Sequence, residues 1–142
     1  MREIHQESET LIVDYRILAK SPKQQVKMLS GGNIQKVVVA RELSSKPTLL
    51  IADQPTRGID VGATEFIRNQ IVDLSRAGTA VLLVSADLNE VIELSDSLIV
   101  MYGGKIVAYF EDASQLDDEV MGEYMLGLKH QTEEEIAKVC YE

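Results

Sequence analysis

Residues 49–60 read LLIADQPTRGID, an apolar run that ends in a carboxylate and leads into a turn. The four apolar residues from Leu49 to Ala52 are typical of a buried strand in a parallel sheet. Active sites of such sheets lie at the carboxyl ends of the strands, which is where Asp53 falls. A carboxylate there can hold Mg²⁺ through water, but aspartate is equally common there as a turn or capping residue. We therefore expect a strand over 48–53 and treat Asp53 as a candidate metal ligand.

The residues after this stretch alternate between helical and strand patterns. Gly78 is placed to cap a helix at its C-terminus, and Gly103-Gly104 is a hairpin turn signal. The order of strand, helix, strand and hairpin predicts an α/β fold with parallel strands, flanking helices and a C-terminal hairpin. The expected elements are a helix over 62–77, a buried strand over 79–85, a brief helix over 88–94 and a hairpin over 97–110.

Helical patterns also precede and follow these elements. A helix is expected over 33–46, with Ser30 as its N-cap and Pro47 as its end. Apolar residues at helical spacing predict a further helix near the N-terminus, which stops before a Ser-Pro pair. The expected terminal helices cover 8–18, 114–128 and 132–140.

Composition excludes several classes of protein. A length of 142 residues suits one compact domain, and 45% apolar with 26% charged residues excludes a disordered, collagen-like or disulfide-scaffold chain. The longest apolar runs are far shorter than the roughly 20 residues of a spanning helix, and the N-terminus lacks the apolar run of a secretory signal. The single cysteine, Cys140, cannot form an internal disulfide, which indicates an idle thiol in a reducing cytosol.

The net charge of −9 is concentrated near the C-terminus. Residues 111–142 carry ten carboxylates, opposed only by Lys129 and Lys138. Such a segment repels phosphodiester backbones and anionic lipids, so nucleic acid is not an expected partner. The simplest interpretation of the segment is a solvated end that keeps the chain in solution.

Ser30-Gly31-Gly32-Asn33 opens the helix expected over 33–46. Two glycines leave the first-turn amides open to close approach, and a helix N-terminus carries roughly half a positive charge. Ser30 can add a hydroxyl, so the segment suits a phosphate oxygen. Taken alone, an ordinary capped helix explains these residues equally well.

A third candidate lies in the turn before the helix expected over 62–77. Residues 57–60 read RGID, and Asp60 either contributes to a site with Asp53 or caps that helix. Neither interpretation is preferred from this turn alone. The order and spacing of the three stretches carry more information than any one of them.

Together, the three stretches resemble the ATP-binding-cassette (ABC) ATPases. Residues 29–36, which read LSGGNIQK, resemble the signature motif of the family, 49–53 resemble Walker B and 58–60 resemble the D-loop. Residues 53–63 are most similar to the branch that imports simple sugars and nucleosides, whose ATPase subunits carry two cassettes in one chain. The resemblance extends over about residues 8–129 and is strongest to the C-terminal half of the second cassette.

The resemblance implies a partial P-loop NTPase fold in which ATP lies between Walker A of one cassette and the signature of another. This chain would give its signature in trans to ATP at a partner cassette, and Asp60 would be its D-loop residue. Asp53 would hold Mg²⁺ through water in a complete site, with neither ATP nor Mg²⁺ bound tightly by the chain alone. Residues 1–129 would be the C-terminal portion of the nucleotide-binding domain, and 130–142 an acidic tail. The residues expected at the nucleotide are Ser30, Gly31, Gly32, Asn33 and Gln35.

Three features depart from the family pattern. The 142 residues contain no G-x-x-x-x-G-K-[ST] sequence, the Walker A motif that cradles phosphates. Gln54 stands where the family places the glutamate that polarises the attacking water, and an amide does not accept a proton at neutral pH. Ala86 stands where the family places its switch histidine. These departures predict a cassette with no intact catalytic residue and a chain that is inactive alone.

The resemblance predicts a part of the ATP-binding subunit of an importer for simple sugars or nucleosides. Its partners would be a second cassette, transmembrane permease subunits and, indirectly, a solute-binding protein, at the inner face of the cell membrane. Strands without a cover also predict self-association of the chain. The alternative is a stand-alone, non-catalytic interaction or regulatory domain on the same scaffold, and a third hypothesis is an unrelated phosphate-binding enzyme.

Overall fold

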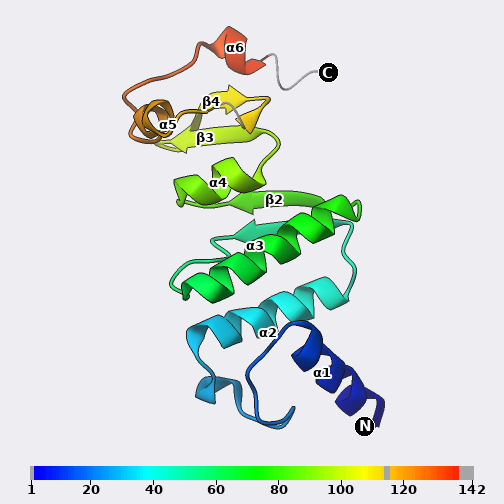
Figure 1. Ribbon diagram of the computed structural model, residues 1–142. Helices are drawn as coiled ribbons and strands as arrows, with labels where there is room; N and C mark the ends of the chain where they lie inside the picture. The colour runs from blue at the N-terminus through cyan, green and yellow to red at the C-terminus, as the bar shows by residue number, and fades with distance from the viewer. Residues whose placement is uncertain (1, 114–115, 138–142) are drawn as a thin grey trace. The chain divides into compact units, whose positions relative to one another are not determined.

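The computed structural model describes residues 2–113 and 116–137, in two compact units formed by residues 1–82 and 83–142 (Figure 1). The first unit contains α1 (Arg2–Asp14), the 3-10 helix η1 (Val26–Met28), α2 (Gly31–Ser44), β1 (Leu49–Asp53) and α3 (Val61–Arg76). The division between the units falls within β2 (Ala80–Val84). The second unit continues with α4 (Leu88–Leu94), β3 (Leu98–Tyr102), β4 (Lys105–Phe110), α5 (Asp118–Met125) and α6 (Glu133–Ala137).

Helix α1 begins and ends earlier than the expected 8–18, so this prediction is wrong at both ends. The helix closes with a Schellman motif, in which the Ile17 N–H donates to the Ile12 carbonyl at 2.9 Å. Arg16, at φ +49°, donates its N–H to the Val13 carbonyl at 3.1 Å. Glycine usually occupies this left-handed position, so an arginine there leaves no signal in the sequence.

The cap predicted at Ser30 and the capping interpretation of Asp60 are confirmed, and Asp87 caps α4 in the same way. Ser30, Asp60 and Asp87 each accept a hydrogen bond from the backbone N–H three residues ahead, at 3.4, 2.9 and 3.2 Å. These bonds satisfy donors that have no partner inside α2, α3 and α4. Gly78, at φ +100°, closes α3 as predicted.

Strands β1 and β2 pair with each other and run in the same direction, joined through α3 (Figure 1). The Thr48 carbonyl accepts from the Ala80 N–H at 3.0 Å, next to the bond from the Thr79 hydroxyl to the Pro47 carbonyl at 2.9 Å. The predicted parallel strand–helix–strand unit is therefore confirmed, with each strand shorter by one or two residues than expected.

The two strands are half-exposed, contrary to the expectation of buried strands. Leu49 is 55% exposed, Ile51 64% and Leu82 53%, whereas Ala52 is buried. A parallel strand is buried only when both faces of its sheet are covered, and one face has no cover among the described residues. The apolar pattern predicts a strand that is stable when both faces are covered, but it does not show whether the described residues cover both faces.

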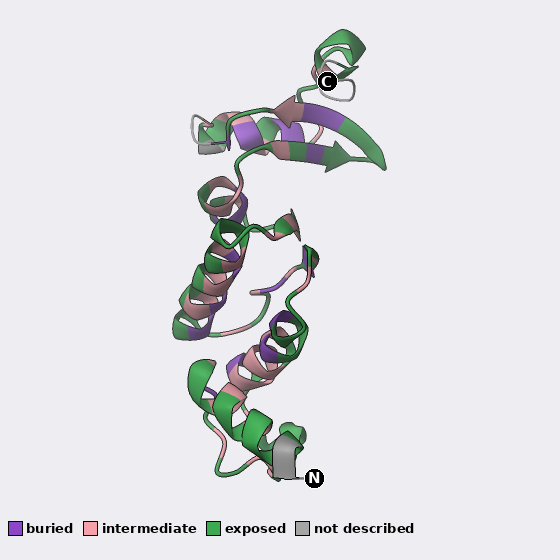
Figure 2. Cartoon of the chain, turned by 90° about the vertical axis from the view of Figure 1, so that its right-hand side faces the viewer, coloured by how far each residue is buried: buried purple, intermediate pink, exposed green. Residues whose placement is uncertain are grey.

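The second unit has a small core around the predicted hairpin, which is confirmed. Gly103 and Gly104 turn the chain at φ +57° and +77° between the antiparallel strands β3 and β4. Met121 of α5 lies in the core of this unit as expected, and buried residues appear purple on the hairpin and on α5 in Figure 2. Gln131 continues the hydrogen bonding of β4, because its side chain pairs with both the N–H and the carbonyl of Tyr109, at 2.8 and 3.0 Å. The core residues are Val100, Val107, Ala108, Met121 and Tyr124.

Helix α5 covers Asp118–Met125 of the expected range 114–128, and α6 covers Glu133–Ala137 of the expected range 132–140. Residues 114–115 and 138–142, including Cys140, lie outside the described residues. In the part of the chain that the structure describes, no helix has both the length and the apolar character needed to cross a membrane.

Helix α2 packs against the start of α3 at Gly32. A Cβ on Gly32 would lie 2.6 Å from Asp60 Oδ2 and 2.9 Å from Ala63 Cβ, and both distances are too short. A Cβ on Gly31 would meet only the Gly58 carbonyl, at 3.9 Å, which is ordinary contact. Gly32 is therefore required by the packing of the two helices, whereas the position of Gly31 has room for a Cβ.

We expect Gly32→Ala to destabilise the chain by about 1–3 kcal/mol, the usual cost of overpacking. The added methyl group must displace either the Asp60 cap or the Ala63 side chain. Gly31→Ala is the matched control, and it should be neutral or slightly stabilising because alanine is the better helix former. Urea unfolding followed by circular dichroism checks both, and equal effects of the two variants would contradict the packing role of Gly32.

Candidate functional site

The N-terminus of α2 presents polar donors to solvent. Ser30 and Gly31 are exposed, and Ser30 Oγ accepts hydrogen bonds from the Asn33 backbone N–H at 3.4 Å and from Asn33 Nδ2 at 2.8 Å. The amides of the first turn have no partner inside the helix, and the helix dipole adds partial positive charge there. This end of α2 can receive an anionic oxygen.

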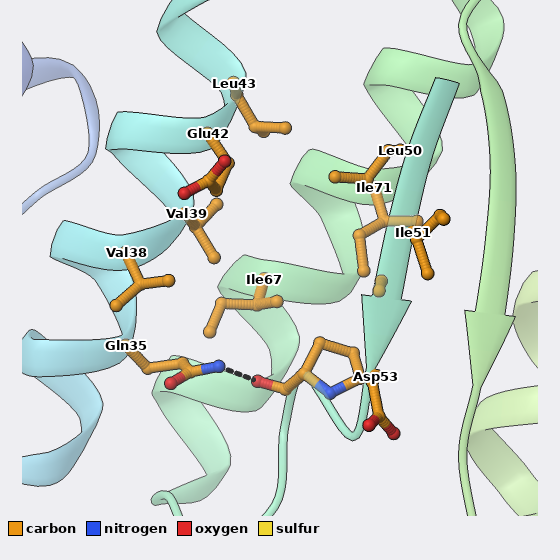
Figure 3. Close-up of a pocket in the computed structure, with 12 residues that line it drawn as sticks. Gln35, Val38, Val39, Glu42, Leu43, Leu50, Ile51, Asp53, Ile67 and Ile71 are labelled. Carbon is orange, nitrogen blue, oxygen red and sulfur yellow. Dashed lines mark hydrogen bonds between the residues drawn. The ribbon is translucent and has the colours of Figure 1, made fainter. Parts of the chain in front are cut away.

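The turn between β1 and α3 is hydrogen-bonded to a side chain of α2. Gln35 Nε2 donates to the Pro55 carbonyl at 2.8 Å, drawn as a dashed line in Figure 3. Asp60, further along the same turn, reaches Gly32. Two contacts therefore set the position of residues 54–60 relative to the start of α2, and the Gln35 side chain is engaged within the chain.

A mainly apolar pocket of about 160 Å³ lies between α2, β1 and α3 (Figure 3). Val38, Val39, Leu50, Ile67 and Ile71 are among its lining residues. Polar groups enter the lining only through Gln35, Glu42 and Asp53, and Figure 3 shows the Asp53 carboxylate directed away from the valines and from Ile67. Such a lining suits apolar side chains better than a nucleotide.

Asp53 and Gln54 lie at the carboxyl end of β1, as predicted. The Asp53 side chain is exposed at this edge. Gln54 adopts the left-handed conformation at φ +49°, and its carbonyl accepts from the Arg57 N–H at 3.2 Å, so the chain turns sharply here. This conformation is uncommon for residues other than glycine, asparagine and aspartate, and the sequence did not indicate it.

The structure brings together only part of the predicted site. The start of α2 lies beside Asp60, whose carboxylate both caps α3 and faces Gly32, so the capping interpretation of Asp60 is correct and does not exclude the other. Asp53 stands at the end of the neighbouring strand. Ala86 belongs to the second unit, between β2 and α4.

Sequence reasoning missed a set of contacts between α2 and the segment after α1. Lys36 Nζ donates to the Arg16 carbonyl at 3.3 Å and lies 4.8 Å from the centre of the Phe66 ring. Tyr15 meets the same ring edge-on, and burial, followed by the charge of Asp14, raises the pKa of Tyr15. No periodicity could have revealed these contacts, because they join α2, α3 and the segment after α1.

The start of α2 and the end of β1 offer groups of two different kinds, one suited to a nucleotide phosphate and the other to a magnesium ion. Among the described residues, no three His, Cys, Asp or Glu side chains gather as a metal-binding group. Asp53 offers one exposed carboxylate, which suits an ion whose other ligands are phosphates and water. Ser30 and the first-turn amides of α2 offer donors that suit phosphate oxygens.

Comparison with known proteins shows which proteins the chain resembles. The model of the ABC transporter family matches residues 3–57. The chain is 52% identical over 99 residues to the glucose import ATP-binding protein TsgD13 of Haloferax volcanii, and this match covers 70% of the chain and 18% of that protein. It is 39% identical over 118 residues to the guanosine import ATP-binding protein NupO of Bacillus subtilis, covering 83% of the chain and 23% of that protein.

A third relative is named for the import of ribose. The chain is 42% identical over 119 residues to the ribose import ATP-binding protein RbsA of Halalkalibacterium halodurans, covering 84% of the chain and 24% of that protein. The chain thus spans about a fifth to a quarter of the length of these relatives.

Solved structures show the same fold. MJ1267, an ATP-binding cassette of an ABC transporter, superposes with a TM-score of 0.71 at 22% identity, over 89% of this chain and 49% of that one. A nucleotide-free ATP-binding cassette from an ABC transporter gives a TM-score of 0.68 at 23% identity, over 96% of this chain and 49% of that one. The chain is therefore similar in sequence to ATP-binding proteins of ABC transporters, and it has the α/β fold of their ATPase cassette.

Proposed function

We propose that the chain is part of the ATP-binding subunit of an ABC importer for a simple sugar or a nucleoside. The observation that carries this proposal is the start of α2, where Ser30 and Gly31 present exposed donors beside the Asp60 turn. The relatives named for glucose, guanosine and ribose import support the class of solute. In this role the chain gives its signature in trans to ATP and Mg²⁺ at a partner cassette.

The second part of the proposal concerns the chain's own hydrolytic site. Gln54 and Ala86 replace the two side chains that would activate water and contact the γ-phosphate. An amide does not accept a proton at neutral pH, and a methyl group makes no hydrogen bond to a phosphate. We assign the chain to the C-terminal portion of a second, degenerate cassette, with residues 1–129 in the cassette and 130–142 as an acidic tail.

The partners follow from this assignment. They are a second cassette, transmembrane permease subunits and, indirectly, a solute-binding protein, on the cytoplasmic face of the membrane. The net charge of −9 opposes nucleic acid as a partner. The alternative, a stand-alone interaction or regulatory domain, is favoured by the exposed apolar face of β1, which offers a surface for another protein.

The 142-residue chain alone should not hydrolyse ATP and should bind it weakly. It presents a signature and one carboxylate at Asp53, but neither a Walker A lysine nor a general base. Phosphate release by the purified chain should equal the buffer blank. Turnover that disappears in Asp53→Ala would contradict the proposal.

Damage to the two half-sites should be unequal in the full-length subunit, assembled with its membrane partner in vesicles. Gly31→Asp places a carboxylate against a phosphate and should lower solute uptake by about a hundredfold or more, the range seen when one preorganised donor is lost. Gln54→Ala should change uptake little, because Gln54 accepts no proton. ATP turnover and solute uptake are both measured.

The reverse change provides the control for the degenerate site. Gln54→Glu supplies a base but no switch histidine at Ala86, so the ATPase rate should rise at most slightly. If Gln54→Ala proves as damaging as Gly31→Asp, the second site is active and the asymmetric proposal is wrong.

The exposed strands should lead the chain to self-associate. Leu49, Ile51 and Leu82 leave an apolar strand surface open, and an uncovered strand edge is a template for pairing between molecules. Light scattering should show oligomers at high micromolar concentration. Ile51→Lys should reduce the oligomers. Val13→Lys changes a comparably exposed residue of α1 and should not reduce them. A strict monomer that binds no hydrophobic dye is the contrary result.

A further inference from the structure

We propose that Asn33 is a positioning residue, one that makes the Ser30 hydroxyl an obligate hydrogen-bond donor toward a phosphate oxygen. The inference rests on the proposed function and deepens it. It states how the chain prepares the serine of its signature before any nucleotide arrives.

Two N–H groups of Asn33 converge on one oxygen atom. Asn33 Nδ2 donates to Ser30 Oγ at 2.8 Å, and the Asn33 backbone N–H donates to the same atom at 3.4 Å. A hydroxyl oxygen has two lone pairs and one hydrogen, so these bonds occupy its acceptor capacity. The hydroxyl hydrogen remains, and within residues 2–113 and 116–137 no acceptor holds it.

The polarity of this arrangement is set by a third bond. Asn33 Oδ1 accepts from the Leu18 backbone N–H at 2.7 Å. Because a backbone N–H can only donate, the amide must place its oxygen toward Leu18 and its NH₂ group toward Ser30. Leu18 directly follows Ile17, which closes the Schellman motif of α1. The segment after α1 therefore fixes the direction of the hydrogen bonds at the signature.

The chemistry of the ligand matches this direction. A phosphate oxygen is an acceptor and takes charge-assisted hydrogen bonds from hydroxyl and amide donors. Because the Ser30 hydroxyl hydrogen is not bound within the described residues, the hydroxyl needs no reorientation when such an oxygen approaches. Asn33, whose carbonyl oxygen and one N–H are used within the chain, acts through Ser30.

The variant that isolates this role is Asn33→Asp. The introduced carboxylate keeps an acceptor for the Leu18 N–H, but it cannot donate to Ser30 Oγ and instead accepts the hydroxyl hydrogen. It also adds a negative charge, which repels phosphate whatever the hydroxyl does. The same substitution in a Ser30→Ala background carries the charge effect without the hydroxyl, so a double-mutant cycle separates the two.

The experiment titrates the 142-residue chain with inorganic phosphate, with sodium chloride at equal ionic strength as the control. The amide signals of Gly31 and Gly32 are followed by ¹H–¹⁵N NMR. We expect Asn33→Asp to weaken phosphate binding about tenfold more with Ser30 present than in the Ser30→Ala background, as suits one hydrogen bond to a charged group. Thermal melting of all four proteins checks that the fold is unchanged.

Three results would overturn the inference. One is an equal effect of Asn33→Asp in both backgrounds, which would reduce Asn33 to a charge or packing position. Another is that Ser30→Ala leaves the two side-chain amide signals of Asn33 unchanged. That result would mean that the Nδ2–Oγ bond does not form in the wild-type chain. The last is a wild-type chain in which the amide signals of Gly31 and Gly32 do not shift when phosphate is added. The proposed function is judged separately, by Gly31→Asp in vesicles, so the two can fail independently.

Discussion

The close approach of α2 to the start of α3 at Gly32 is the constraint on which the rest of the first unit depends. Only a residue without a side chain fits between the two helices, because a Cβ there would lie 2.6 Å from Asp60 Oδ2. That fit keeps Asp60 at the N-cap of α3 and leaves Gln35 opposite the Pro55 carbonyl. The exposed end of α2 and the turn after β1 are held together as a consequence.

The two glycines of the same motif therefore serve different purposes. Gly31 is exposed and has room for a Cβ, whereas Gly32 is buried in the contact between the two helices. The two glycines lie on different faces of the same helix turn, because successive residues of a helix point about 100° apart. A motif that looks uniform in the sequence thus contains one exposed glycine and one glycine that is buried in a helix–helix contact.

The chain leaves apolar surfaces open that a second polypeptide could cover. The strand residues Leu49, Ile51 and Leu82 are more than half exposed, and the pocket between α2, β1 and α3 has a mainly apolar lining. The chain also spans only 18–24% of the length of the relatives described above. Burial of such surfaces is the main favourable contribution to association.

The sequence by itself determined the fold class, the order of the elements, the cap at Ser30 and the hairpin at Gly103-Gly104, and it offered the cap at Asp60 as one of two interpretations. These are local matters, decided by hydrophobic period and by side chains that bond to the nearby backbone. The end of α1 and the turn at Gln54 escaped prediction, because Arg16 and Gln54 occupy left-handed positions that carry no glycine signal.

Only the tertiary structure decided which polar groups meet. The bond from the Leu18 N–H to Asn33 joins residues 15 positions apart, and that from Gln35 to Pro55 joins residues 20 apart. Neither periodicity nor spacing encodes a contact of this kind, since it depends on how separate helices and turns pack. The exposure of the strands was decided at the same level, because burial is a property of the cover over a strand and not of the strand's own residues.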